Sequence, residues 1–250
     1  MVTFGRKLPI GIQTFEKIRC GGYSYVDKTE LVWRLISSSV PNFLSRPRRF
    51  GKSLLLSTFE AYFEGKKDLF KGLIIEKYEE KWEKYPVLHL DLNAEKYDTI
   101  ESLNAILSNQ LTQWEAIYGK GEDENTLSNR FKGVIQRAYD QSGKGVVVLV
   151  DEYDKPLLQA IHDKQLLKAY RDTLKAFYGV LKSKDSCLRF VFLTGVTKFS
   201  QVSVFSDLNQ LNDISMSKAY ATICGLTQQE LLDNFTPELE ALAEENEQTF

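Results

Sequence analysis

The segment GVVVLVDEYD, residues 145–154, constrains the fold more than any other part of the chain. It contains five consecutive apolar residues, four of which are valine. Such a run suits a β-strand that is buried on both faces, and strands of this kind occur in parallel sheets covered by helices on each side. We therefore expect a strand at residues 146–150, close to the centre of a parallel sheet.

Short apolar runs alternate with longer amphipathic runs from about residue 41 onward, which is typical of α/β proteins. The expected strands are 42–45, 87–92, 146–150, 188–193 and 220–224. The expected helices are 51–64, 99–118, 126–140 and 164–182. This pattern predicts an α/β fold, a three-layer sandwich with a central, mainly parallel β-sheet.

The chain divides into three parts by the same reading. Residues 1–40 form an entry segment packed on the core, residues 41–225 form the core, and residues 226–250 begin a C-terminal helical element. The sequence TQQE at Thr227–Glu230 predicts a capping box, and Thr236-Pro237 predicts a second helix start. The second helix runs to Phe250, so we expect a helical lid or further domain to be cut off there.

Composition excludes several classes of protein. The formal net charge of −2 at pH 7 argues against an overall basic body that binds nucleic acid nonspecifically, so any anion site must be local. Three widely spaced cysteines and two histidines form no zinc-ligand or nucleophile pattern, which favours a reduced, cytoplasmic protein. No stretch approaches the roughly 20 apolar residues of a membrane span, so no membrane partner is expected.

A phosphate-binding motif follows the first expected strand. Gly51-Lys52-Ser53 is the second half of the pattern G-x-x-x-x-G-K-[ST], placed between a short strand and an apolar helix. Backbone N–H groups at a helix N-terminus attract phosphate, and glycine allows close approach. We expect Lys52 to reach the β- and γ-phosphates, Ser53 to ligate Mg²⁺, and Phe50 and Leu54 to border the nucleotide.

The front of this loop departs from the pattern. Arg46 stands where the first glycine is expected, and Pro47, Arg48 and Arg49 follow. A side chain at 46 and a missing N–H at 47 prevent the usual backbone path without adjustment. The guanidinium groups of Arg46, Arg48 and Arg49 can replace the lost donors by pairing with phosphate oxygens. The alternative is a basic surface turn before a helix.

A second motif lies at the end of the valine-rich strand. Asp151 and Glu152 have the form of a Walker B element, in which Asp151 holds hydrated Mg²⁺ and Glu152 polarises the attacking water. The alternative is a strand end that caps the next helix. Thr194 ends a further strand, where it senses the γ-phosphate or orients water, together with Lys198; the alternative is an ordinary turn. Asp154 is expected to be a cap or a surface charge.

Asp91 ends another expected strand, in VLHLDLN. Its carboxylate faces the same crevice, or it forms a turn; the two alternatives are equally compatible with the sequence.

Several segments in a fixed order resemble the bacterial AAA-ATPase-like family, whose members are predicted P-loop ATPases often joined to a C-terminal restriction-endonuclease-like nuclease domain. The segments are LPIGIQTFEKIRCGGYSYVDKTELVWRL, FLSRPRRFGKSLLLSTFEAYFEGKKDLFKGL, VVVLVDEYDKPLL, FLTGVTKFSQVSVFSDLNQLNDIS and YATICGLTQQEL. The resemblance implies an AAA/STAND-like arrangement and ATP with Mg²⁺ as ligands. It also implies that RPRRFGKS is a lineage variant, that Lys52 and Ser53 bind ATP, and that Asp151 and Glu152 act as Walker B residues.

The leading hypothesis is a magnesium-dependent, ATP-binding and ATP-hydrolysing module that couples nucleotide state to a C-terminal domain or partner. A non-hydrolysing nucleotide-sensing scaffold and a nucleic-acid-associated effector are the alternatives. The expected partners are nucleotide, a C-terminal nuclease domain or partner protein, and a second copy of the chain that supplies an arginine. No paired carboxylates with a lysine follow the core, so nuclease activity is not expected in these residues.

Overall fold

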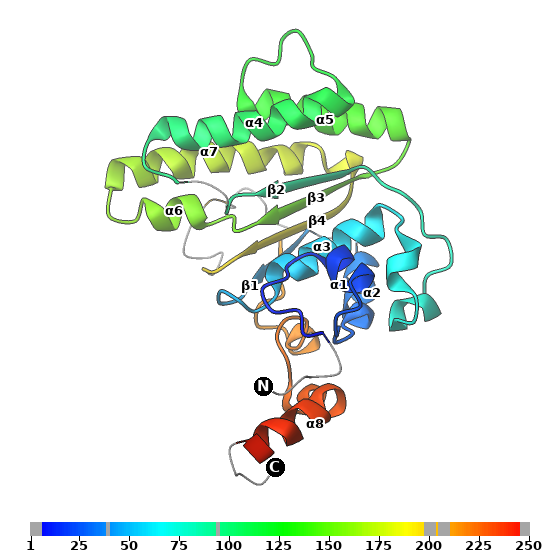
Figure 1. The fold of residues 1–250 in the computed structure, drawn as a ribbon. Helices are drawn as coiled ribbons and strands as arrows, with labels where there is room; N and C mark the ends of the chain where they lie inside the picture. The colour runs from blue at the N-terminus through cyan, green and yellow to red at the C-terminus, as the bar shows by residue number, and fades with distance from the viewer. Residues whose placement is uncertain (1–6, 39–40, 94–95, 198–203, 205–210, 246–250) are drawn as a thin grey trace.

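The computed structural model describes residues 7–38, 41–93, 96–197, 204 and 211–245 (Figure 1). One five-stranded sheet has the order β2-β3-β4-β1-β5, and every pairing in it is parallel. The strands are β1 (Asn42–Ser45), β2 (Val87–Asp91), β3 (Val146–Asp151), β4 (Leu188–Gly195) and β5 (Asn212–Asp213). The predicted α/β class and central sheet are therefore confirmed, and the sheet is parallel throughout.

Helices cover both faces of the sheet, which gives the predicted three layers (Figure 1). One face carries α1 (Phe15–Cys20), α2 (Thr29–Ile36) and α3 (Lys52–Phe63). The other carries α4 (Ile100–Tyr118), α5 (Leu127–Ser142) and α7 (Lys164–Ser183), with the short α6 (Lys155–Gln159) after β3. In the described part of the chain, 3₁₀ segments are η1 (Lys67–Phe70), η2 (Ile74–Lys77), η3 (Asp185–Cys187) and η5 (Lys218–Tyr220).

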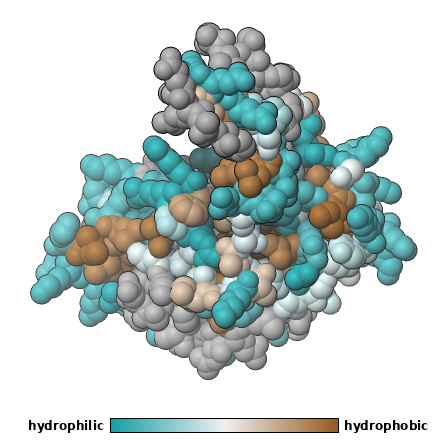
Figure 2. Space-filling view, turned by 90° about the horizontal axis from the view of Figure 1, so that it is seen from below, coloured by the Kyte–Doolittle hydropathy of each residue, from teal (hydrophilic) through white to brown (hydrophobic). Residues whose placement is uncertain are grey.

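Helix α8 (Gln228–Glu245) extends away from the sheet (Figure 1). It opens with the predicted capping box, because the Thr227 amide donates to Glu230 at 2.8 Å and the Glu230 amide donates to Thr227 at 3.1 Å. The backbone leaves helical geometry at Phe235, just before Thr236-Pro237. The face seen from below, on which α8 lies, carries separate apolar patches among hydrophilic surface (Figure 2).

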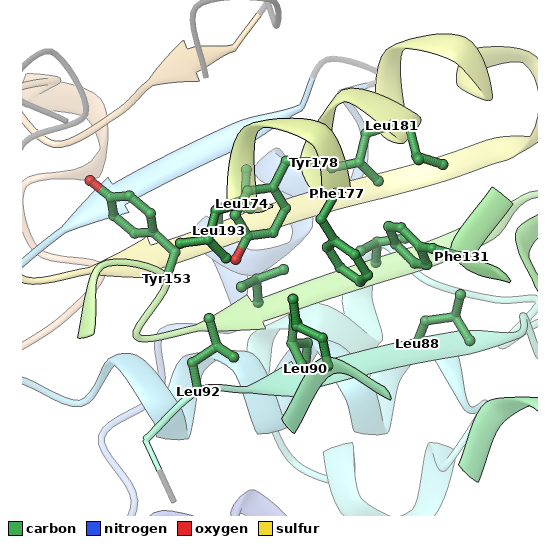
Figure 3. Packing of buried hydrophobic residues seen from close by; sticks show 14 of the residues in the cluster. Leu88, Leu90, Leu92, Phe131, Tyr153, Leu174, Phe177, Tyr178, Leu181 and Leu193 are labelled. Atoms are coloured by element: carbon green, nitrogen blue, oxygen red, sulfur yellow. The ribbon is translucent and has the colours of Figure 1, made fainter. Parts of the chain in front are cut away.

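The core consists of one apolar cluster on each face of the sheet. All six residues of β3 are buried, and its side chains alternate between the clusters: Val148 packs with α4, α5 and α7, whereas Leu149 packs with α3. Leucines of β2 and aromatic residues of α5 and α7 meet over the sheet (Figure 3). Phe131 and Phe177 stack there with centroids 4.4 Å apart. Burial on both faces explains the continuous apolar run of this strand.

The predicted strand at 220–224 is wrong. Residues 218–220 form η5, and the chain then turns, with Ile223 and Cys224 buried against the α3 side of the core. Residues 220–224 include apolar side chains because this turn is buried, and not because they form a strand. The fifth strand is instead β5, two exposed polar residues that pair with β1 and carry no apolar signal.

The strand order determines where polar residues meet. β4 lies between β1 and β3, and all three run in the same direction. Their carboxyl ends therefore open at one edge of the sheet, the edge at which ligands bind in open α/β folds. No helix in the described part of the chain is both long and apolar enough to traverse a bilayer.

Candidate nucleotide-binding site

The loop between β1 and α3 turns into the helix through left-handed backbone. Gly51 precedes the first helical residue with φ of 89°, and a Cβ there would meet no atom within 4 Å. Conformation rather than space therefore favours glycine at this position. A second left-handed residue is Arg49, with φ of 66°, whereas Arg46 is not among the residues with positive φ. The loop thus adjusts to the missing first glycine by turning three residues later.

Lys52 points back into its own loop. Its side chain is 4% exposed, and Nζ lies 3.2 Å from Glu152 Oε1. The same Nζ donates to the carbonyl oxygens of Arg46 at 3.1 Å and Pro47 at 3.3 Å. The structure therefore brings together the predicted phosphate-loop lysine and the predicted catalytic glutamate, from two segments a hundred residues apart in the sequence.

Asp151 is the centre of a buried hydrogen-bond cluster. Its carboxylate accepts from the Ser53 hydroxyl at 2.5 Å, from the Thr194 hydroxyl at 2.6 Å and from the Glu152 amide at 3.0 Å. Thr194 is fully buried, so its hydroxyl is committed to this carboxylate. Three predicted site residues thus form one connected unit: Ser53 at the start of α3, Asp151 at the end of β3 and Thr194 next to the end of β4.

Glu152 adopts a left-handed conformation, with φ of 53°. Non-glycine residues in this region cost about 1–3 kcal/mol and cluster at functional sites. This conformation changes the backbone direction after β3, and the Glu152 carboxylate lies beside Lys52.

The oxygen atoms of Ser53 and Asp151 suit a magnesium ion. Hydroxyl and carboxylate oxygens are hard ligands, and these two already lie in contact. The described residues contain no group of three or more His, Cys, Asp and Glu side chains that could enclose a metal by themselves. Mg²⁺ is commonly held by one or two protein oxygens plus water and phosphate, and the pair present here fits that mode.

The three loop arginines have different environments. Arg46 donates from its guanidinium to the carbonyl oxygens of Ser215 at 2.7 Å and Ser45 at 3.0 Å, and reaches that of Tyr220 at 3.5 Å. Arg48 and Arg49 are exposed and, among the described residues, make no hydrogen bond or ion pair through their side chains. Only Arg48 and Arg49 therefore present free guanidinium groups at the mouth of the loop.

An apolar pocket of about 170 Å³ adjoins the start of α3. Phe50, Gly51 and Leu54 line one side of it, and the N-terminal segment and the turn after η5 line the others. Cys224 is one of the turn residues, and burial raises the pKa of its thiol to about 11. Phe50 and Leu54 thus lie where a group attached to a loop-bound phosphate would extend.

Asp154 has a role that the sequence does not reveal. It occupies the N-cap position of α6, but its side chain makes no capping hydrogen bond to that helix, and it is fully buried rather than a surface charge. Its carboxylate accepts from the amides of Val196 at 3.0 Å and Thr197 at 2.6 Å, which fixes the turn after β4. A cap prediction uses neighbours in sequence, whereas these donors come from a segment more than forty residues away.

The remaining candidates lie outside this cluster. Asp91 is exposed and accepts from the Asn93 amide at 2.7 Å, which is the turn alternative. Lys198 lies outside the described residues. On the α3 side of the sheet, His89 Nδ1 lies 3.1 Å from Glu60. Burial opposes the charged imidazole, but the hydrogen bond and charge of Glu60 outweigh it and raise the pKa of His89.

Comparison with known proteins decides the family. A family model described as "Predicted AAA-ATPase" matches residues 9–205, which include the phosphate loop, β3 and β4. The chain belongs to this AAA-ATPase-like family. An uncharacterized protein from the 5′ region of vnfD in Azotobacter chroococcum mcd 1 is 42% identical over 241 residues. The alignment covers 95% of this chain and 46% of that relative, so the chain spans about half of the relative's length.

No solved structure matches the chain significantly. The family match confirms the resemblance seen in the sequence segments. Together with the parallel sheet, it supports nucleotide binding in general terms.

Proposed function

We propose that this AAA-ATPase-like chain is a magnesium-dependent module that binds and hydrolyses ATP and passes its nucleotide state to a C-terminal domain or partner. One observation carries the proposal: Lys52, Ser53, Asp151, Glu152 and Thr194 converge at the carboxyl ends of three adjacent parallel strands. Positioning and electrostatic stabilisation dominate phosphoryl-transfer catalysis, and a basic loop facing paired carboxylates suits both.

Each residue has a role in this proposal. The amides that begin α3 and the ammonium group of Lys52 hold the β- and γ-phosphates. Ser53 and Asp151 hold Mg²⁺, which when bound neutralises charge that develops on the phosphate oxygens. Thr194 orients the Asp151 carboxylate through its hydroxyl. Glu152 leaves Lys52 when phosphate arrives and then accepts a hydrogen bond from the attacking water.

The pocket beside α3 is the proposed site of the nucleobase. Its wall is mainly apolar, which suits the faces of a planar base next to the charged phosphate loop. A route to the C-terminal element begins there, because the Gly225 amide donates to the Phe50 carbonyl at 3.1 Å. Lys28 of the N-terminal segment forms an ion pair with Glu230 at the start of α8. Nucleotide binding would act on α8 through these contacts.

The non-hydrolysing scaffold is the second candidate, favoured by the contact between Glu152 and Lys52. If that pair persists with ATP bound, Glu152 has no water to orient and the chain senses nucleotide without turnover. The two candidates share the phosphate loop and differ in the freedom of one carboxylate.

Calorimetric titration of Mg-ATP followed by phosphate release tests both candidates. Binding should disappear in Lys52→Ala and persist in Lys67→Ala, a matched control at an exposed lysine. Turnover lost in Glu152→Gln supports the ATPase, and binding without turnover supports the scaffold. No binding by the folded chain would refute both, and salt-dependent DNA binding that persists in saturating ATP would favour the nucleic-acid alternative.

A further inference from the structure

Arg46 makes its side-chain contacts on the side of the loop that faces residues 214–226, here called the connector. Its guanidinium donates to the connector carbonyls of Ser215 at 2.7 Å and Tyr220 at 3.5 Å, as well as to that of Ser45. Its backbone carbonyl accepts from Lys52 Nζ at 3.1 Å. One residue therefore contacts both the phosphate-loop lysine and the connector.

The connector is also attached at both of its ends. The Ile214 amide donates to the carbonyl of Phe43 in β1 at 3.0 Å, and the Gly225 amide donates to that of Phe50 at 3.1 Å. Between these points, the Ser45 amide donates to the Ser215 hydroxyl at 2.8 Å. The last part of the connector, residues 223–226, forms one wall of the pocket beside α3.

We propose that Arg46 is a positioning residue that sets the shape of the nucleobase pocket, and that it is not a phosphate ligand. The inference rests on the proposed nucleotide-binding function. A planar guanidinium can offer donors to several carbonyl oxygens at once, whereas an ammonium group is a compact point charge. Arginine at the position of the usual first glycine thus joins the phosphate loop to the pocket wall.

Titration with two probes, Mg-ATP and Mg-tripolyphosphate, separates the two roles. Arg46→Ala should weaken ATP binding by about tenfold and change tripolyphosphate binding by less than about twofold, because only the base contacts the wall. Arg46→Lys should resemble Arg46→Ala, since it keeps the charge and loses the planar fork. Arg48→Ala, the matched control at an exposed loop arginine, should weaken both probes equally.

Equal loss of both probes in Arg46→Ala, with recovery in Arg46→Lys, would overturn the proposal and make Arg46 a phosphate ligand. Hydrogen exchange without nucleotide provides a measurement independent of ATP binding. Arg46→Ala and Arg46→Lys should accelerate exchange of the Gly225 amide while β3 stays protected. If Arg46→Ala does not fold, Ser215→Ala replaces it as the test variant. It removes the hydroxyl acceptor of the Ser45 amide and should also accelerate exchange of the Gly225 amide.

Unchanged exchange in these variants would overturn the anchoring role even if ATP binds. A wild-type chain that binds neither probe but shows the accelerated exchange in its variants would refute the proposed function and leave the anchor standing.

Discussion

Replacing Glu152 by Gln should tighten ATP binding while abolishing turnover. The reason is competition, because in the proposed function phosphate takes the place of Glu152 on the ammonium group of Lys52. In the structure this group lies 3.2 Å from Glu152 Oε1, and the two side chains are only 4% and 14% exposed. A neutral amide can still accept a hydrogen bond from Lys52, but it no longer opposes the arrival of phosphate by Coulomb attraction.

The size of the effect follows from the distance. Two unit charges at this separation attract by about 5 kcal/mol at an effective dielectric constant of about 20. Desolvation of both groups offsets most of this, and close charge pairs measured in proteins couple by about 1.5 kcal/mol or more. We therefore expect Glu152→Gln to bind Mg-ATP about tenfold more tightly, since about 1.4 kcal/mol corresponds to a factor of ten.

Calorimetric titration of Mg-ATP measures this difference, with phosphate release measured on the same samples. Glu64→Gln is the matched control, because Glu64 pairs with Lys66 at 3.0 Å on the exposed surface at the other end of α3. It should change neither affinity nor turnover. Unchanged or weaker ATP binding by Glu152→Gln would refute the competition between phosphate and Glu152 for Lys52.

Three further predictions concern single residues, two in the site and one in the Glu60–His89 pair outside it. Arg49→Gly should raise the free energy of unfolding by about 0.5 kcal/mol, because the left-handed conformation costs about 1–2 kcal/mol in arginine and the added chain entropy of glycine costs about 0.5–1 kcal/mol. Urea denaturation measures this as a higher midpoint, and a lower midpoint would contradict it. Thr194→Val should lower the free energy of unfolding by about 1.5–3 kcal/mol and reduce phosphate release, because it removes a donor to buried Asp151, whereas Thr194→Ser should retain most of both. Glu60→Gln should lower the free energy of unfolding most near pH 6, because that pH lies below the raised pKa of His89 and above the lowered pKa of Glu60, so both groups are charged. The loss of stability should become smaller as pH rises through the His89 pKa. Urea titrations that show the same loss at pH 6 and pH 9 would contradict this.

The sheet and its main helices follow from local patterns. The four longer strands and the helices α3, α4, α5 and α7 lie within a few residues of their predicted positions. β3 was the most predictable element, because burial on both faces requires apolar residues throughout its length. Once parallel strands are accepted, the meeting of Ser53, Asp151 and Thr194 follows as well, because parallel strands end at one edge.

Long-range contacts explain what the sequence did not predict. The two residues of β5 are polar, so only their pairing with β1 makes them a strand. Asp154 looks like an exposed cap, and only the turn after β4, more than forty residues away, makes it a buried acceptor. The direction of the Arg46 guanidinium depends on carbonyl groups about 170 residues later. No local pattern encodes such partners.

The altered loop is consistent with a working phosphate site because each departure from the usual pattern has a local compensation. Gly51, where the chain enters α3, keeps the left-handed conformation that the pattern requires. The second left-handed residue is Arg49. Pro47 has no N–H to donate, but the exposed guanidinium groups of Arg48 and Arg49 follow it in the loop. Burying Lys52 against Glu152 costs desolvation free energy, which a loop without a ligand would avoid if the lysine pointed into solvent. The buried pair therefore supports the proposed role of Lys52, in which phosphate displaces Glu152.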